Sequence, residues 1–342
     1  MEYIRVEGTH YACGFQLGNK YPASFKEMVR DYKEYLVTIH SWEKCLKLAN
    51  KCLKITKVYF PWVIDELEGA AKGAGVDFLE LFICSIEELY TVKTPFGKCS
   101  DVLVNQGRML VGHNNDLSPL YEEMLVIVDW NIPEEPRQLS VGVCGIFVSV
   151  GINCLGLCVT GNEVSPNDDR VGIPRLLLAR VAMAQETFED AVNVTLHSHR
   201  ASSYNTIISS KSGEALSIEG SATDFELLKM TDGFLAHTNH YLSEKMNKYE
   251  RDDKLSLDYV NSCNRCKKIL DLLNRYQKAV NIDDLVEILS YHGTSEGNNA
   301  VCRHDKDIKT VFSFLADLEN GEITVIKGNP CVSLDRRVFR IY

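Results

Sequence analysis

The hydrophobic pattern of this chain changes near residue 98, and that change constrains how the chain can fold. From about residue 8 to residue 92, apolar residues recur at helical spacing. From Cys99 onward, short apolar runs of strand type take over: SDVLV, RMLVGHN, EMLVIVDW, QLSVGVCGIFVSVGIN and GLCVTGN. Several of these runs are apolar enough to be covered on both faces. We therefore expect a helical first third that packs against sheets built from the remainder.

The rest of the chain alternates between helical and strand patterns. A helical stretch spans about 173–198, and two more lie between about 255 and 292. Strand pairs are predicted around turns at Lys211–Gly213 and Glu319–Gly321. There is no internal repeat and no Pro, Gly or Ser-rich linker. This order predicts an α+β protein in which sheets lie between helical layers.

The composition of the chain limits which molecules it can bind and where in the cell it can reside. The net charge is −10 without a Lys/Arg cluster, so nucleic acid and anionic membranes are poor candidates. The first residues lack the pattern of a signal peptide, and no apolar run has the length of a membrane span. Twelve cysteines without a secretion signal indicate a reducing compartment, which predicts a cytoplasmic protein. Most of these cysteines, such as Cys84 and Cys144, are expected to be buried small hydrophobic residues.

Cys99 opens the first strand-type run, and this position suits a nucleophile that self-cleavage exposes. Its thiol would attack the Lys98 carbonyl, and water would then release the preceding segment and free the Cys99 amine. An α-amine and a thiol titrate within about one pH unit of each other, so the new amine can serve as the base. Composition alone favours a packing role for any one of twelve cysteines.

Motifs spread along the whole chain resemble one enzyme family, the acyl-coenzyme A:6-aminopenicillanic acid acyltransferases. These are N-terminal-nucleophile (Ntn) hydrolases with a cysteine nucleophile. The motifs are Gly8–Gly14 with Gly18, Glu66–Gly75, Cys99-Ser100, Gly112–Asp116, Gly151–Leu157, Gly172–Arg175, His237–Tyr241 and Asn299–Arg303. The resemblance implies a four-layer αββα sandwich, a mainly helical pro-segment over residues 1–98 and a catalytic region over residues 99–342. It also implies autoproteolysis at Lys98-Cys99 and chemistry on amide or thioester bonds.

The resemblance also assigns roles by position. Asp116 would bind the nucleophile's amine or position the substrate, whereas without the family it reads as a turn residue. Asn239 would donate to the oxyanion, and a structural asparagine in a turn is the equally simple alternative. Asn162, at the end of GLCVTGN, resembles an oxyanion-side asparagine of bile-salt hydrolases. Arg303 would steady Asp116 or a substrate carboxylate, whereas in isolation it reads as a surface arginine.

Three further features are interpreted as having no function. Cys263 and Cys266 have CxxC spacing, but they lie in a helical pattern and no second ligand pair completes a zinc site. His237 and His240 would diverge in a strand. Ser100 lacks the glycines of a nucleophile elbow. The sequence therefore predicts neither a metal nor a cofactor, with acyl-coenzyme A considered only as a substrate.

Two departures from the family pattern leave alternatives open. Lys98 stands where the penicillin-making member has glycine, and glycine reaches strained backbone geometry more easily. Asn115 also replaces the aromatic residue that often fills the middle of the Asn-x-Asp motif. The first hypothesis is an autoprocessing amidohydrolase or acyltransferase for a small acyl amide or thioester. Its pro-segment would stay as a non-covalent partner, and a homo-oligomer is compatible with the sequence. The alternatives are an unprocessed Ntn scaffold that serves as a binding protein and, last, a papain-type protease.

Overall fold

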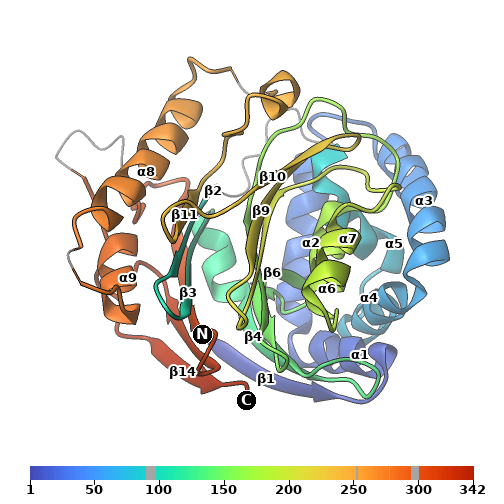
Figure 1. Cartoon of the computed structure of the whole chain (residues 1–342). Coiled ribbons are helices and arrows are strands. Elements are labelled where there is room, and N and C mark those ends of the chain that lie inside the picture. Colours follow the sequence, from blue (N-terminus) through green and yellow to red (C-terminus); the bar gives the residue numbers. More distant parts are fainter. Residues whose placement is uncertain (90–97, 252, 277, 294–299) are drawn as a thin grey trace.

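Two β-sheets packed face to face form the centre of the molecule, and helices cover both outer faces (Figure 1). The computed structural model describes residues 1–89, 98–251, 253–276, 278–293 and 300–342. Gly97 and Asn299, which adjoin or belong to the motifs above, lie outside these ranges. The four layers confirm the αββα sandwich that the sequence predicts.

The larger sheet has eight strands in the order β1-β4-β5-β6-β7-β8-β9-β10. Neighbouring strands are antiparallel except β1 and β4, which run parallel. The strands are β1 (Glu2–Glu7), β4 (Leu125–Asn131), β5 (Gln138–Val143), β6 (Phe147–Asn153), β7 (Leu157–Asn162), β8 (Asn205–Ser210), β9 (Ala215–Gly220) and β10 (Phe225–Leu228).

The smaller sheet has six antiparallel strands in the order β11-β2-β3-β12-β13-β14. The strands are β2 (Lys98–Asn105), β3 (Met109–Leu117), β11 (Phe234–His237), β12 (Lys309–Asp317), β13 (Glu322–Lys327) and β14 (Arg336–Arg340). Strands β2 and β3 are central and buried on both faces, which explains their near-continuous apolar runs. Cys99 thus lies at the start of a central strand.

Helices from three parts of the chain form the two outer layers. Helices α8 (Leu257–Leu273) and α9 (Ile282–Leu289) cover the smaller sheet, where Ile269, Leu285 and Ile288 pack on Val102 and Val104. The outer face of the larger sheet carries the remaining helices (Figure 1): α1 (His10–Lys20), α2 (Pro22–Leu36), α3 (Trp42–Tyr59), α4 (Pro61–Ala74), α5 (Phe78–Ile83), α6 (Arg175–Met183) and α7 (Phe188–Thr195). Short 3₁₀ turns span Cys84–Leu89, Pro119–Met124 and Met246–Tyr249.

Residues before Cys99 are built into the sandwich. Strand β1 pairs with β4 along its whole length, from Glu2 to Glu7. Helices α1 and α4 cross so closely that a Cβ at Gly14 would lie 1.9 Å from the Glu66 carbonyl oxygen, and one at Gly69 would lie 2.1 Å from that of Tyr11. These motif glycines therefore serve packing. A pro-segment cleaved at Lys98 would still be held by a shared sheet and a shared core.

Local predictions from the sequence are confirmed at several points. The turns at Lys211–Gly213 and Glu319–Gly321 join β8 to β9 and β12 to β13. Cys263 and Cys266 lie within α8. In the described ranges, no helix combines the length and apolar character needed to cross a membrane.

Candidate functional site

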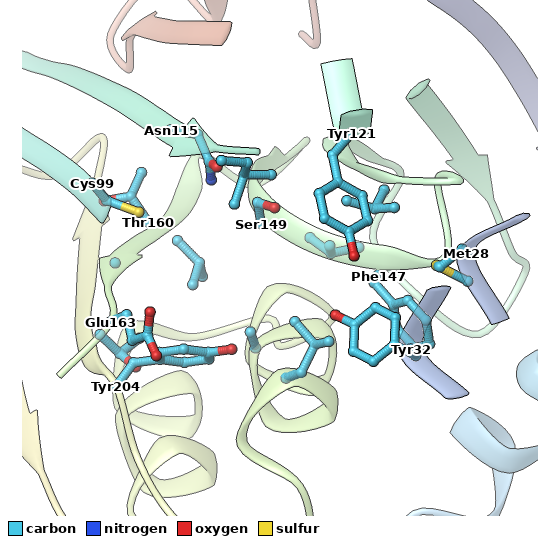
Figure 2. Close-up of a pocket in the computed structure, with 18 residues that line it drawn as sticks. Met28, Tyr32, Cys99, Asn115, Tyr121, Phe147, Ser149, Thr160, Glu163 and Tyr204 are labelled. Carbon is cyan, nitrogen blue, oxygen red and sulfur yellow. The ribbon is translucent and has the colours of Figure 1, made fainter. Parts of the chain in front are cut away.

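A cavity lies between the two sheets and reaches α2 and α6. Figure 2 shows Cys99 and Asn115 at one end of the cavity and Met28 and Tyr32 at the other. Much of the lining is apolar, contributed by Met28, Leu117, Val143, Phe147, Val148, Val159, Leu176 and Ala179. The polar lining residues are Tyr32, Cys99, Asn115, Tyr121, Ser149, Thr160, Glu163, Tyr204 and Thr206. The cavity thus joins a thiol to a long apolar space.

The Cys99 backbone is fixed from two sides. Its N–H donates to Oδ1 of Asn239 at 3.0 Å, and its carbonyl oxygen accepts from Nη1 of Arg265 at 2.7 Å. The residue is 7% exposed and lines the cavity, so the sulfur is sheltered yet reachable. These contacts hold the nitrogen that would become the α-amine after cleavage at Lys98.

Asn239 contacts Cys99 through its carbonyl oxygen rather than through its amide nitrogen. Oδ1 accepts from Cys99 and from Nη2 of Arg265, the latter at 2.7 Å, while Nδ2 donates to the Glu163 carbonyl at 3.0 Å. The geometry therefore supports a role in holding the Cys99 nitrogen. An oxyanion would have to compete with Glu163 for the Asn239 amide.

Arg265 is a site residue that sequence reasoning missed. It lies on α8 inside the CxxC segment, and its side chain is fully buried. Besides Cys99 and Asn239 it binds Oγ of Ser100 at 2.7 Å and Oδ1 of Asn261 at 2.8 Å. Burial lowers the pKa of Arg265 to about 10, against the attraction of Asp116. The guanidinium is therefore still charged at neutral pH. The CxxC spacing drew attention to the cysteines, although the arginine between them reaches the site.

Asp116 points to the face of β3 opposite Asn115, which lines the cavity, and Arg303 is linked to it through Thr310. Oδ1 of Asp116 accepts from the Thr310 hydroxyl at 2.7 Å, and Thr310 in turn accepts from the Arg303 N–H at 2.9 Å. Burial raises the pKa of Asp116, while the charges of Arg265 and Arg303 oppose the rise. Arg303 binds Asp305 through Nε and Nη2, at 2.8 and 2.6 Å. Asp116 and Arg303 thus form, together with Arg265, a cluster of buried charges behind Cys99, here called the charge cluster.

Two buried polar atoms of this cluster lack a hydrogen-bond partner among the described residues: Oδ2 of Asp116 and Nη1 of Arg303. Buried polar groups are normally paired, and unpaired ones call for a functional or structural explanation. Neither Asp116 nor Arg303 lines the cavity. Asp116 is linked to Cys99 through Arg265, whose charge acts on Asp116 and whose guanidinium binds the Cys99 carbonyl.

His113 and Asp101 form a second group that sequence reasoning missed. They are cross-strand partners on β3 and β2, and strand alternation places them on the same face as Cys99 and Asn115. His113 Nδ1 lies 3.1 Å from Asp101 Oδ1, and both side chains are fully buried. Burial lowers the pKa of His113, but Asp101 and a hydrogen bond with Cys99 outweigh it and raise the pKa to about 10. The signal in the sequence was the spacing Cys99-x-Asp101, because residues two positions apart on a strand point to the same face.

His113 is therefore a cation at neutral pH, and this has a measurable consequence. Its folded pKa lies above the unfolded value of about 6.5, so its contribution to stability is complete below pH ~6.5 and is lost as pH rises through about 10. We expect wild-type stability to fall by up to ~1.4 kcal/mol per pH unit in this window relative to His113→Gln. Urea unfolding at several pH values measures this difference, and equal slopes in both proteins would contradict it.

Asn162 is the last residue of strand β7, next to residues that line the cavity. Its Oδ1 accepts from Nδ2 of Asn205 and lies 3.1 Å from Nδ1 of His237. Its Nδ2 is buried and has no partner in the part of the chain that the structure describes. Thr160 and Glu163, on either side in sequence, line the cavity, although Asn162 itself does not. Among the predicted residues, Asn162 thus retains an uncommitted amide donor.

Of the five predicted catalytic residues, only Cys99 lines the cavity. Asn239 contacts Cys99 directly, Asp116 and Arg303 lie behind it, and Asn162 lies beside the cavity floor. His237 forms a buried pair with Glu219 at 2.8 Å. This supports the interpretation of His237 as a structural residue.

The sequence model of the family "Acyl-coenzyme A:6-aminopenicillanic acid acyl-transferase" matches residues 103–331, more than half of the chain. The matched range includes Asp116, Asn162, Asn239 and Arg303, and it begins four residues after Cys99. The "Beta-alanyl-dopamine/carcinine hydrolase" of Drosophila melanogaster is 28% identical over 218 residues. That match covers 56% of this chain and 56% of the fly protein, so the chain spans about half the length of this relative.

Among solved structures, similarity is found to two hydrolases. A mutant of the conjugated bile acid hydrolase from Clostridium perfringens has a TM-score of 0.47 and 12% identity, over 71% of this chain and 96% of the other. Penicillin V acylase from Agrobacterium tumefaciens has a TM-score of 0.40 and 12% identity, over 67% of this chain and 82% of the other.

Proposed function

The chain belongs to the acyl-coenzyme A:6-aminopenicillanic acid acyltransferase family, and we propose that it is an amidohydrolase or acyltransferase whose nucleophile is Cys99. The observation that carries the proposal is the position of Cys99. It lines the cavity, while its nitrogen is held by Asn239 and its carbonyl by Arg265. A packing cysteine needs neither a cavity nor a buried arginine at its backbone. The substrates proposed are small acyl amides or thioesters.

The proposed maturation begins at Lys98. The Cys99 thiol attacks the Lys98 carbonyl, so a thioester forms and the peptide C–N bond breaks, which leaves Cys99 with a free amine. Water then hydrolyses the thioester, producing a carboxylate on Lys98 and restoring the thiol. The backbone contacts of Cys99 with Asn239 and Arg265 limit its movement during this exchange, which favours attack by proximity.

Turnover uses the same atoms. The Cys99 amine takes the thiol proton, the sulfur attacks the substrate carbonyl, and the amine returns the proton to the departing amine or thiol. Water or an acceptor amine then releases the acyl group from sulfur. His113 is a poor base because Asp101 and Cys99 keep it protonated at neutral pH. As a cation beside the sulfur, it instead supports the charge that develops there. For the oxyanion, Nδ2 of Asn162 is favoured over Nδ2 of Asn239, because it has no partner among the described residues whereas Asn239 donates to the Glu163 carbonyl.

The cavity lining favours one class of substrate. Its residues include eight apolar side chains and no lysine or arginine, within the described ranges. The carboxylate that lines it, Glu163, pairs with Arg175 at 3.3 Å, and Arg175 stacks on the Tyr204 ring at 4.2 Å. Such a lining suits an apolar group and a neutral or cationic amine, and it disfavours a carboxylate or phosphate inside the cavity. The fly hydrolase is named for β-alanyl-dopamine and carcinine, and for this chain we propose small N-acyl amines.

Intact mass after expression tests the maturation step. We expect a fragment that begins at Cys99 together with a fragment that ends at Lys98. Lys98→Gly should cleave faster than the wild type, by about threefold or more, because glycine enters strained backbone geometry at lower cost. The time course of the two masses gives both rates.

Full-length chain that persists in both proteins would reject autoproteolysis. It would favour the alternative in which the sandwich is retained as a binding protein. Lys98 is the observation behind that alternative, because lysine reaches the strained backbone geometry of self-cleavage less easily than glycine. If Lys98→Gly cleaves itself and the wild type does not, the lysine is what prevents self-cleavage of the wild type.

A further inference from the structure

Four ligating side chains converge away from the Cys99 cavity. His292 follows α9, Cys302 and His304 precede β12, and Cys331 lies between β13 and β14. The ligand atoms of the four all lie within 4.8 Å of one another. These residues are up to 39 positions apart in the sequence and form no motif, so CxxC spacing does not reveal them. From this cluster we infer that the protein binds a structural zinc ion.

The distances match a tetrahedral site. Zinc–sulfur bonds of ~2.3 Å and zinc–nitrogen bonds of ~2.05 Å place sulfur pairs ~3.8 Å apart, nitrogen pairs ~3.3 Å apart and mixed pairs ~3.6 Å apart. The Cys302 and Cys331 sulfurs are 3.6 Å apart, and the Nε2 atoms of His292 and His304 are 3.0 Å apart. Nε2 of His304 lies 3.5 Å from the Cys302 sulfur and 3.3 Å from the Cys331 sulfur.

Hydrogen bonds among the four residues do not explain this convergence. Nε2 of His304 faces three ligand atoms at once, and a single N–H can point at only one of them. A cation at the centre uses all four lone pairs. Two thiolates and two neutral imidazoles also balance the charge of a divalent ion. Because four protein ligands leave no open position, the site is structural rather than catalytic.

Asn329 supports the proposed zinc site from outside the ligand set. Asn329 donates from Nδ2 to the Cys302 sulfur at 3.3 Å and to the Arg303 carbonyl at 2.5 Å. Amide donors to a thiolate ligand are typical of the groups that orient metal ligands. Arg303 lies between two ligands in sequence, and its N–H donates to Thr310, which binds Asp116. The zinc ion would therefore anchor the segment that carries Arg303 beside the charge cluster behind Cys99.

Metal analysis of the purified full-length protein tests the inference. After dialysis against EDTA and gel filtration under reducing conditions, we expect about one zinc ion per chain. Replacement by Co²⁺ should produce the thiolate-to-metal charge-transfer band and strong visible bands of a tetrahedral site with sulfur ligands. This spectrum is recorded on the wild type, so it does not depend on a variant that folds.

Variants then assign the ligands. Cys331→Ser and His292→Gln should each weaken zinc binding by about 100-fold or more, whereas Cys263→Ser in the α8 CxxC pair should retain the full content. Wild-type protein without zinc after EDTA, equal zinc in all variants, or a Cys302–Cys331 disulfide in place of the metal would each overturn the inference.

Discussion

Cys99→Ala is expected to lower hydrolysis of small N-acyl amines by about 10⁴-fold or more, since it removes the proposed nucleophile. Such a loss corresponds to ~5.4 kcal/mol of transition-state stabilisation. The same substitution should leave the chain uncleaved, because the proposed maturation and turnover use the same sulfur. Stability should change little, since the side chain borders a cavity and the residue makes its fixing contacts through the backbone.

The assay uses amides that share one acyl chain and differ in the amine, which is neutral, cationic or carboxylate-bearing. Wild type should discriminate against the carboxylate, because no basic side chain of the described residues lines the cavity. Cys154→Ser is the matched control, since Cys154 is a half-buried free cysteine in the turn between β6 and β7. An alanine variant that still hydrolyses the panel, or still matures, would remove Cys99 from the mechanism.

Arg265→Met should produce the second largest effect, a loss of ~3–5 kcal/mol in the free energy of unfolding together with failure to mature. The variant leaves four acceptors without their buried donor: the Cys99 carbonyl, Ser100, Asn239 and Asn261. It also removes a positive charge that favours ionised Asp116. Urea unfolding and intact mass measure the two effects.

Lys267→Met is the matched control, because it removes a positive charge from an exposed position two residues further along α8. Arg265→Lys should lie between wild type and Arg265→Met, since an ammonium keeps the charge but cannot span the same acceptors as a planar guanidinium. If Arg265→Met has the same free energy of unfolding as the wild type and matures to the same extent, Arg265 does not organise the site.

The contrast between Cys99 and Arg265 shows how far sequence reasoning reaches in this protein. Cys99 was recognisable as a candidate because a change of periodicity and a series of ordered motifs mark its position. Arg265 has no such mark, and it reaches Cys99 only because α8 packs across β2 and β11. His113 is an intermediate case, since strand alternation could have placed it on the face of Cys99 once the β2–β3 register was known.

The order of helical and strand patterns, together with the family motifs, was sufficient to predict the αββα sandwich, because hydrophobic periodicity reports which faces of each element are buried. Local chemistry also predicted the turns at Lys211–Gly213 and Glu319–Gly321. The arrangement around the Cys99 sulfur required the tertiary structure, because hydrogen bonds there join residues up to 166 positions apart. The same holds for the four proposed zinc ligands, which converge only when β12 pairs with β13. Sequence alone therefore singled out the proposed nucleophile, whereas packing decided which groups surround it.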